Sequence, residues 1–298
     1  MPADKTFAGV QHIFCPTDLT ARSQRTLAFA AQLAAVSGAR LTVFHAAPDT
    51  WFRPSSGDVL ESKCSVERQI LNCVGTYIND LDLDIIVEKG PDAAAEIVRL
   101  ARELDVDLVV MKARPGVSSA LHFGSIVERV ISGSRCPVLL LPAAFLSETD
   151  PVFDKLHFKR ILFDYDFSQA TDDLFHLTNE LTRDHDSVLN VISILEPPPA
   201  YGVDLDQLES SKLQLGSAIK NRLSNAILHE GRSPADVSTR VAWGSHTDTI
   251  LSYARDREID LICTALPAPD RFADRFYKLY LGQLLASSTC PVLVKQCV

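Results

Sequence analysis

Hydrophobic residues along the first half of this chain fall into short continuous runs separated by longer stretches with helical spacing. Apolar runs of this length predict buried strands, and apolar residues that recur three and four positions apart predict one face of a helix. Glycine after such a stretch, as at Gly38, is typical of a helix end. The predicted strands are 11–15, 41–44, 85–87, 108–111 and 138–141, and the predicted helices contain Leu27 to Ala34, Ile70 to Leu81, Ala94 to Ala101 and residues 126–132. We expect residues 46–57 to form a loop, and Gly90 with Pro91 to begin the third helix.

The second half repeats the same order of runs and helical stretches. Its predicted strands are 161–163, 188–194, 237–243, 261–264 and 292–294, and two of its predicted helices are marked by Leu174, Leu177 and Leu181 and by Leu215, Ile219, Leu223 and Ile227. Strands that are apolar throughout and separated by helices indicate a parallel sheet covered on both faces. The expected fold class is therefore α/β, with a doubly wound, five-stranded parallel sheet in each half.

Matching sequence segments show that the halves are copies of one unit. RCPVLLL at 135–141 corresponds to TCPVLVK at 289–295, and the spacings Gly90 to Gly244 and Cys136 to Cys290 are both 154 residues. A period of this length is typical of a duplicated domain rather than a solenoid repeat. We therefore predict one domain at 6–145 and a second at 157–298, joined by a polar linker at 147–157.

Composition narrows the classes of function. The net charge is −9, and both halves are acidic, which argues against a nucleic-acid partner. No apolar run approaches the ~20 residues of a membrane helix, and the N-terminus does not resemble a signal peptide. The seven cysteines form no CxxC pair, and neither they nor the histidines have metal-ligand spacing. We expect a cytoplasmic protein with reduced thiols and no metal, in which Cys15 is a buried structural residue.

Doubly wound sheets bind ligands at the carboxyl ends of their strands, near the point where strand order reverses. The candidate loops are therefore Pro16–Thr20 and Lys112–Ser125, with 164–168 and 265–279 in the second half. Gly124 and Ser125 open a helix, where free N–H groups and the helix dipole favour a phosphate. Ser125 with Glu128 also fits a capping box, so the pair could serve only as a helix cap.

These motifs together resemble the universal stress protein (UspA) family. The resemblance rests on PTDLT at 16–20, Gly90-Pro91, Gly124-Ser125 and CPVLLL at 136–141, and it extends over nearly all of both halves. It implies a five-stranded α/β fold, frequent dimerisation through the last strand, and membership of either an ATP-binding or a non-binding class. In such a family adenine is held by backbone groups at the end of strand two, here the region of Val43. Asp18 is then placed to meet a ribose hydroxyl, or it could only bond the loop backbone.

The loop after strand four departs from the family's ATP-binding pattern. That pattern is G-x-x-G, then nine residues, then G-[S/T]. Its first two glycines correspond here to Met111 and Arg114, and a one-residue slip in the alignment would place Lys112 at the first of them. Only Gly124-Ser125 is retained. Side chains in place of glycine would narrow a phosphate cradle. Lys112 and Arg114 could contact phosphate by charge, or they could be solvated.

In the second half the cradle is further reduced. An ungapped alignment on Cys290 places Lys278-Leu279 opposite Gly124-Ser125, and a slipped alignment would use Gly282-Gln283 instead. The aromatic and basic loop 271–280 suits either an amphipathic surface helix or an anion shelf. The predicted ligand-binding residues are Pro16, Thr17, Asp18, Val43, Met111, Lys112, Arg114, Gly124, Ser125 and, in the second half, Asp166.

Three hypotheses for function follow from this pattern. The first is a stress-response binding or regulatory module that binds ATP or a related adenine nucleotide in its first half. Its halves would form a pseudo-dimer by pairing 138–141 with 292–294, because exposed edge strands favour association, and a homodimer is possible. The second is a nucleotide-dependent enzyme such as a slow ATPase, for which Asp18, or Asp164 with Asp166, are the candidate carboxylates. The third is a partner-binding scaffold whose clefts are filled by side chains. No catalytic residue or metal ligand is assigned.

Overall fold

The fold of the first half begins with the strand that carries the candidate aspartate loop. In this computed structural model, the residues that can be described are 9–47, 58–75, 81–90, 92–113, 125–147, 158–183, 187–195, 205–266 and 273–296. The first half contains β1 (His12–Pro16), α1 (Ala21–Ser37), β2 (Arg40–Ala47), α2 (Asp58–Val74), β3 (Leu83–Lys89), α3 (Ala93–Glu103), β4 (Leu108–Lys112), α4 (Ser125–Gly133), β5 (Val138–Leu141) and α5 (Ala143–Ser147).

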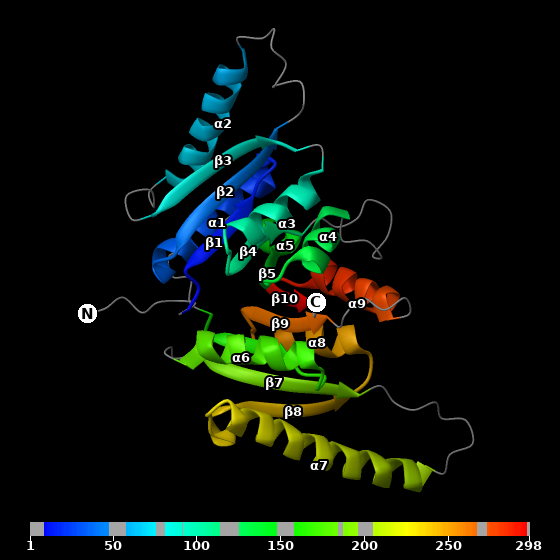
Figure 1. The fold of residues 1–298 in the computed structure, drawn as a ribbon. Helices are drawn as coiled ribbons and strands as arrows, with labels where there is room; N and C mark the ends of the chain where they lie inside the picture. The colour runs from blue at the N-terminus through cyan, green and yellow to red at the C-terminus, as the bar shows by residue number, and fades with distance from the viewer. Residues whose placement is uncertain are drawn as a thin grey trace.

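The second half repeats this order of elements. It contains β6 (Arg160–Asp164), α6 (Gln169–Arg183), β7 (Val188–Leu195), α7 (Leu205–His229), a 3-10 turn η3 (Pro234–Asp236), β8 (Ser238–Trp243), α8 (His246–Asp256), β9 (Leu261–Leu266), α9 (Ala273–Ser287) and β10 (Val292–Gln296). The two halves lie one above the other, with β5 and β10 in the middle and α2 and α7 at opposite ends (Figure 1).

All ten strands belong to one sheet, in the order β3-β2-β1-β4-β5-β10-β9-β6-β7-β8. Each half therefore has the same internal order, and in each half the order reverses between the first and fourth strands. The pairings within each half are parallel, whereas β5 and β10 pair antiparallel, with Leu139 opposite Leu293. The sequence prediction that 138–141 pairs with 292–294 is confirmed, as is the doubly wound α/β fold.

A hydrophobic core lies on each face of the sheet, and each core runs through both halves. Residues of α1, α2, α6 and α7 pack on one face, where Leu139 and Leu293 join the two halves. Residues of α3, α4, α8 and α9 pack on the other face, where Leu140 and Val292 form the join. These four side chains are 0% exposed. Burial of this kind supplies the main stabilising free energy, so the join is part of the core rather than a loose contact between domains.

Several element boundaries differ from the sequence predictions. β2 extends to Ala47, into the segment expected to be a loop, and Leu81 precedes β3 instead of ending α2. The third helix begins at Ala93, because the Asp92 side chain accepts a hydrogen bond from the Ala95 N–H and caps it. Ser147, expected in the linker, ends the short helix α5. Chain connectivity and local capping, which hydrophobic spacing does not report, decide these ends.

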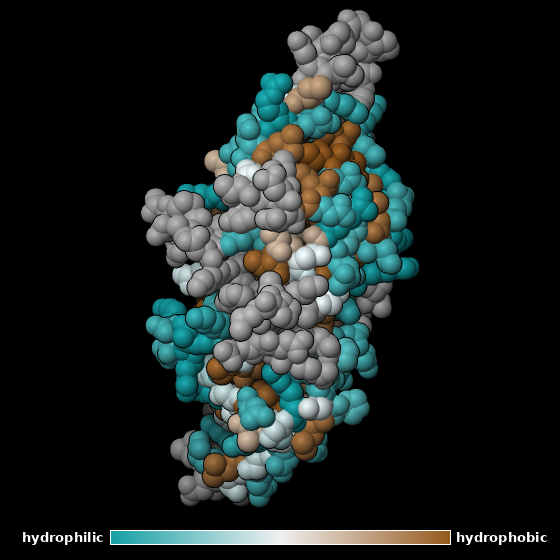
Figure 2. Space-filling model, turned by 90° about the vertical axis from the view of Figure 1, so that its left-hand side faces the viewer, coloured by the Kyte–Doolittle hydropathy of each residue, from teal (hydrophilic) through white to brown (hydrophobic). Residues whose placement is uncertain are grey.

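Leu215 is the clearest error in the predicted core. It continues the apolar spacing of Ile219, Leu223 and Ile227, yet it is 46% exposed, whereas those three side chains are buried. The spacing is continuous, but no described element covers this part of α7. On the face in Figure 2, hydrophilic residues cover much of the visible surface and hydrophobic residues form separate patches.

Four cysteines at strands or just before them behave as expected for structural thiols, whereas Cys64 is exposed on α2. Burial raises the pKa of Cys15 and Cys263 to about 12, and that of Cys136 and Cys290 to about 11. A thiol with a raised pKa is mostly protonated and is a poor nucleophile at neutral pH. Among the described helices, none combines the length and apolar character needed to cross a bilayer.

Candidate functional site

A cavity of about 270 Å³ opens in the first half at the point where the strand order reverses. Its residues come from the carboxyl ends of β1, β2 and β4 and from the first turns of α1, α3 and α4. They are Pro16, Thr17, Asp18, Ser23, Phe44, His45, Ala46, Ala93, Ile97, Met111, Lys112, Ile126 and Val127. The fold therefore brings together residues from six elements that are far apart in sequence, at the edge where doubly wound sheets bind ligands.

The Asp18 loop is held in one geometry by its own hydrogen bonds. The Asp18 carboxylate accepts hydrogen bonds from the Thr20 N–H (3.1 Å), the Thr20 hydroxyl (2.7 Å) and the Ser23 hydroxyl (2.5 Å). Leu19, between them, has a positive φ of 59°, which costs free energy for a residue other than glycine. The loop thus orients the carboxylate before any ligand arrives. Asp18 does bond the loop backbone, and 42% of its side chain remains exposed, so a contact with ribose stays a prediction.

Lys112 lies against this carboxylate from the end of β4. Its Nζ is 2.6 Å from both Asp18 oxygens and 2.7 Å from the Thr20 Oγ1. The Lys112 side chain is only 15% exposed and is paired with Asp18, so it is not a freely solvated lysine. The other sequence alternative, a contact with phosphate, stays a prediction. Partial burial by itself would raise the pKa of Asp18, but hydrogen bonds from Lys112, Ser23 and Thr20 outweigh it and hold that pKa well below its usual range.

The opposite wall of the cavity is formed by the end of β2. The His45 ring hydrogen-bonds the Thr17 carbonyl through Nδ1 (2.9 Å), which fixes β2 to the loop after β1. The side chain of Val43 is 0% exposed and belongs to the core on the other face of the sheet, whereas its neighbours Phe44, His45 and Ala46 line the cavity. The predicted contact at Val43 is made by backbone groups, so it stays a prediction.

The structure places only some of the predicted ligand residues. Pro16, Thr17, Asp18, Met111 and Lys112 surround the cavity. Arg114 and Gly124 lie outside the described residues. Ser125 is the first residue of α4, as expected from its position, and the helix carries Glu128 in its first turn. The backbone therefore supports the predicted helix start, whereas the phosphate cradle itself stays a prediction.

The equivalent position in the second half is filled by its own side chains. Matching strand registers and helix caps make Asp164 equivalent to Pro16, His246 to Ala93, Thr264 to Met111 and Tyr280 to Ile126. Small or apolar cavity residues are thus replaced by groups that can bond one another. In β9 the equivalence given by the strand pairings differs by one residue from the ungapped sequence alignment. The pairings make Ala265 the equivalent of Lys112.

Three donors converge on one oxygen of Asp164. Its Oδ2 is 2.8 Å from His246 Nε2, 3.1 Å from Thr264 Oγ1 and 3.2 Å from Tyr280 OH. The rings of His246 and Tyr280 meet edge to face. Burial, together with the Asp164 charge, raises the pKa of Tyr280 well above its usual range, so the hydroxyl stays a donor. This cluster occupies the space that is open in the first half.

The helix that follows β9 excludes a phosphate cradle at either predicted position. α9 begins at Ala273, so Lys278-Leu279 and the alternative Gly282-Gln283 lie inside a helix instead of at its start. Backbone N–H groups inside a helix are already bonded and cannot bind an anion. Asp166, the counterpart of Asp18, accepts hydrogen bonds from the Ser168 N–H (2.9 Å) and the Thr171 hydroxyl (2.8 Å). The loop geometry is retained, whereas Asp164, His246, Thr264 and Tyr280 beside it bond one another.

The comparison with protein families agrees with the duplicated fold. The model of the universal stress protein family matches the chain twice, at residues 9–142 and 157–295. The chain belongs to the universal stress protein family. No curated protein matches it.

Solved structures that are similar to this chain cover either nearly all of it or about half of it. A universal stress protein from Archaeoglobus fulgidus is 18% identical, with a TM-score of 0.65 over 97% of each chain. A functionally unknown protein from Pseudomonas aeruginosa is 13% identical, with a TM-score of 0.61 over 97% of this chain and 93% of that one. A shorter Archaeoglobus fulgidus universal stress protein, solved in complex with dAMP, is 20% identical over 44% of this chain and 96% of its own, with a TM-score of 0.35. The two full-length likenesses show the fold alone.

Eight cavity residues of this universal stress protein were not predicted from sequence as ligand residues, and four of them lie near the starts of two helices. Ala93, Ile97, Ile126 and Val127 come from the first turns of α3 and α4. Ile126, for example, is apolar and yet 42% exposed at the start of its helix, which only the structure reports. Sequence spacing assigns such residues to the core, because it cannot show that the neighbouring element is missing.

Replacing Lys112 with methionine should make the protein less stable at neutral pH but not in acid. Because the pKa of Asp18 is lowered in the folded state, its charge stabilises the fold above the unfolded-chain value of ~3.9 and loses this effect as pH falls toward the folded value. The variant loses that stabilisation, so the difference in free energy of unfolding between wild type and Lys112→Met should shrink below about pH 4. Urea unfolding across this range measures it, and Lys220→Met, on the exposed side of α7, is the matched control. A difference that does not vary with pH would contradict the assignment.

Proposed function

We propose that this universal stress protein is a binding and regulatory module that takes up one adenine nucleotide, in its first half only. The domains would correspond to residues 6–145 and 157–298, with the second serving as a filled, structural copy. The proposal adds a ligand to what family membership alone implies. Its starting point is the resemblance of the sequence to the ATP-binding class of the family. The cavity at Asp18 is the feature of this chain that carries it.

The observation that supports the proposal is the contrast between equivalent positions in the halves. In the first half, Ala93 and Ile126 line a cavity of about 270 Å³, while His246 and Tyr280 fill the same place in the second. The open cavity is close to the lower end of ordinary ligand sites, which begin at roughly 300 Å³. Its apolar walls suit a flat base, and its rim carries a fixed carboxylate. A nucleoside with a hydroxyl near Asp18 matches that combination.

The residues present fit the nucleoside part of a nucleotide. Phe44 and Met111 supply apolar surface, and the Asp18 carboxylate is an acceptor for a ribose hydroxyl. Lys112 already bonds Asp18, so a ribose hydroxyl would share this carboxylate with an ammonium group. A phosphate chain placed nearby would also gain the Lys112 charge, in place of the backbone donors that glycines would have provided. Phosphate contacts in the segment between β4 and α4 remain part of the proposal.

The test is nucleotide content and affinity in two matched variants. Small molecules released from the freshly purified protein are identified by mass spectrometry, and ATP, ADP, AMP and cyclic AMP are then titrated by calorimetry. Asp18→Asn removes the first-half carboxylate charge, and Asp166→Asn makes the identical change in the second half. We expect Asp18→Asn to weaken binding about ten-fold or more, in line with the loss of a hydrogen bond to a charged group, and Asp166→Asn to leave it unchanged.

Either of two results would overturn the proposal. One is a protein that carries no adenine compound and binds none of the four nucleotides when they are added. The other is equal loss in both aspartate variants, which would place the effect in folding instead of in a site. The first result would favour a partner-binding scaffold, since the second half already has a filled cleft.

A slow ATPase is the second candidate, and one observation bears on it. Asp164, half of the proposed carboxylate pair, is 5% exposed and accepts hydrogen bonds from His246, Thr264 and Tyr280, so it is not available to a substrate. Turnover would then depend on Asp18, whose pKa is too low for it to accept a proton readily near pH 7. We therefore propose binding without efficient hydrolysis.

A further inference from the structure

A larger groove, of about 800 Å³, lies between α6 and α7 of the second half. It is on the sheet face opposite α8 and α9, so it is separate from the filled cleft around Asp164. Each helix lines it with residues at i, i+3, i+4 and i+7, which share one helix face. They are Gln169, Asp172, Asp173 and His176 on α6, and Arg222, Asn225, Ala226 and His229 on α7.

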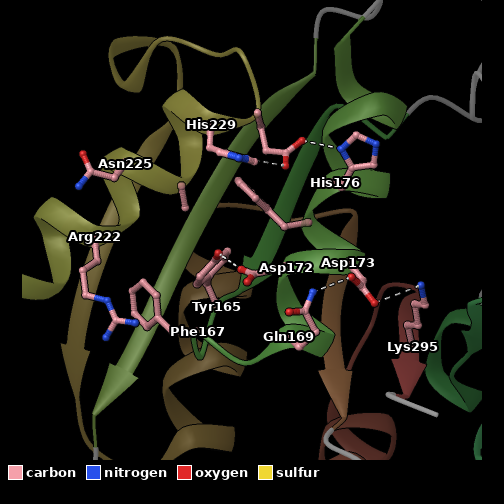
Figure 3. Close-up of a pocket in the computed structure, with 13 residues that line it drawn as sticks. Tyr165, Phe167, Gln169, Asp172, Asp173, His176, Arg222, Asn225, His229 and Lys295 are labelled. Carbon is pink, nitrogen blue, oxygen red and sulfur yellow. Dashed lines mark hydrogen bonds and ion pairs between the residues drawn. The ribbon is translucent and has the colours of Figure 1, made fainter.

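Aromatic rings line one end of the groove, and a guanidinium lies over one of them. Tyr165, Phe167 and Phe175 meet edge to face around Tyr165, with centroids 4.9 and 5.2 Å apart. The Arg222 guanidinium carbon is 4.2 Å from the Phe167 ring centroid, and Figure 3 shows the two side chains against each other. Stacking holds the planar fork of arginine in place, which lowers the entropy lost when it binds a carboxylate or phosphate.

The carboxylates of the groove already have donors. Tyr165 donates its hydroxyl to Asp172, Gln169 donates to Asp173 (3.0 Å), and the His176 ring donates to Glu230 (2.7 Å), as the dashed lines in Figure 3 show. Each acid is therefore matched by a group of the protein itself. A cationic ligand would have to displace these donors.

The cations of the groove are less committed. Within the described part of the chain, Arg222 forms no hydrogen bond or ion pair with an acceptor. Its guanidinium group stacks on the Phe167 ring. Lys295 approaches Asp173 only at 4.0 Å, the outer limit for an ion pair. The Arg222 guanidinium is thus a charged donor without an acceptor of its own in the described structure, and an anion complements it.

The first half lacks these groups at equivalent positions. The two helices α2 and α7 can be aligned by their buried residues, which recur every four positions in both. These residues are Val66, Ile70 and Val74 in α2 and Ile219, Leu223 and Ile227 in α7. This alignment makes Arg222 equivalent to Gln69. By the strand registers, Phe167 is equivalent to Leu19, His176 to Ala28 and Lys295 to Leu141. The duplicated fold therefore does not require an arginine, a lysine, a histidine and an aromatic ring here. All of them occur together only in the second copy.

We propose that the α6–α7 groove binds a small organic anion with a flat apolar body, a carboxylate or an ester of phosphate or sulfate. The acid group meets the Arg222 fork, the body lies in the groove beside Phe167 and Ala226, and Lys295 adds a second positive charge. This site is independent of nucleotide binding in the first half. It gives the second domain a ligand of its own, although its family cleft is filled.

Three probes that share one aromatic body test the charge preference in the full-length protein. Naphthoate, neutral naphthamide and cationic naphthylmethylammonium are titrated by calorimetry at low salt. We expect saturable naphthoate binding, with naphthamide about ten- to a hundred-fold weaker, as for the loss of a charge-assisted hydrogen bond. Naphthylmethylammonium should not bind measurably.

Variants then locate the site. Arg222→Gln should reduce naphthoate affinity to that of naphthamide, and Arg222→Lys should restore only part of it, because lysine lacks the stacked fork. Arg240→Gln is the matched control, since Arg240 is also exposed and lies 5.5 Å from an aromatic ring, that of Tyr253, outside the groove. Circular dichroism and thermal melts show that each variant folds.

The proposal is overturned if naphthylmethylammonium binds as tightly as naphthoate, or if naphthoate does not bind at all. It is equally overturned if Arg222→Gln and Arg240→Gln reduce affinity by the same amount. Should Arg222→Gln fail to fold, Arg222→Lys and Lys295→Gln must each lower naphthoate affinity. Unchanged affinity in both would count against the site.

Discussion

Replacing Ala93 with histidine and Ile126 with tyrosine should abolish the nucleotide binding that we propose for this universal stress protein. These are the residues that His246 and Tyr280 replace in the second half, where they fill the cleft. In the first half both positions line the 270 Å³ cavity, so two added rings would occupy the volume proposed for the base. We expect affinity to fall by about a hundred-fold or more, equivalent to about 2.7 kcal/mol of binding free energy.

The control for this variant adds the same ring types where they cannot reach the cavity. Ala95→His lies on the exposed side of α3, and Val188→Tyr lies at a position that is 50% exposed. Both variants are titrated with ATP and AMP by calorimetry, and urea unfolding measures their stability. Retained affinity in the Ala93→His, Ile126→Tyr protein would show that any nucleotide binds elsewhere. Equal loss in the control would point to a general effect of the substitutions.

Replacing Leu293 with alanine should lower the free energy of unfolding by about 2 to 5 kcal/mol. Leu293 lies in the antiparallel pairing between β5 and β10, directly opposite Leu139, and is 0% exposed. Truncation removes buried apolar surface and leaves a cavity in the core that both halves share. Because that core is continuous, we also expect the two halves to lose stability together.

Leu213→Ala is the matched control for the same chemical change. Leu213 is 72% exposed on α7, so its truncation should change stability by no more than about 0.5 kcal/mol. Urea unfolding is followed by circular dichroism and, separately, by tryptophan fluorescence in a Trp51→Phe background, in which Trp243 of the second half is the remaining tryptophan. If Leu293→Ala destabilises only the signal from Trp243, then the join does not couple the halves. If both leucine variants have equal effects, the pairing carries no special stability.

Much of the fold could be predicted because it depends on patterns that repeat locally. The apolar runs predicted every strand of both halves to within a few residues, and the tendency of exposed edge strands to associate predicted that β5 would meet β10. Predictions failed where a neighbouring element decides the outcome. Leu215 fits the apolar face of α7, yet it is exposed because no described element covers it.

The candidate site was predictable only in part, for a related reason. Asp18, Met111 and Lys112 could be named because strand ends in a doubly wound sheet mark the ligand edge. The side chain of Val43 belongs to the opposite core, so the contact predicted for backbone groups at the end of β2 stays a prediction. The ion pair between Lys112 and Asp18 spans 94 residues of sequence, and no local pattern reports such a contact.

The amino-acid sequence by itself determined that this protein has two copies of one α/β unit and that the second copy has lost more of the phosphate loop. Hydrophobic spacing and chain repetition carry that information residue by residue. Only the tertiary structure decided which cleft is open. The side chains that fill the second cleft, Asp164, His246, Thr264 and Tyr280, come from four segments between 16 and 116 residues apart. Their hydrogen bonds exist only once the sheet has brought those segments together.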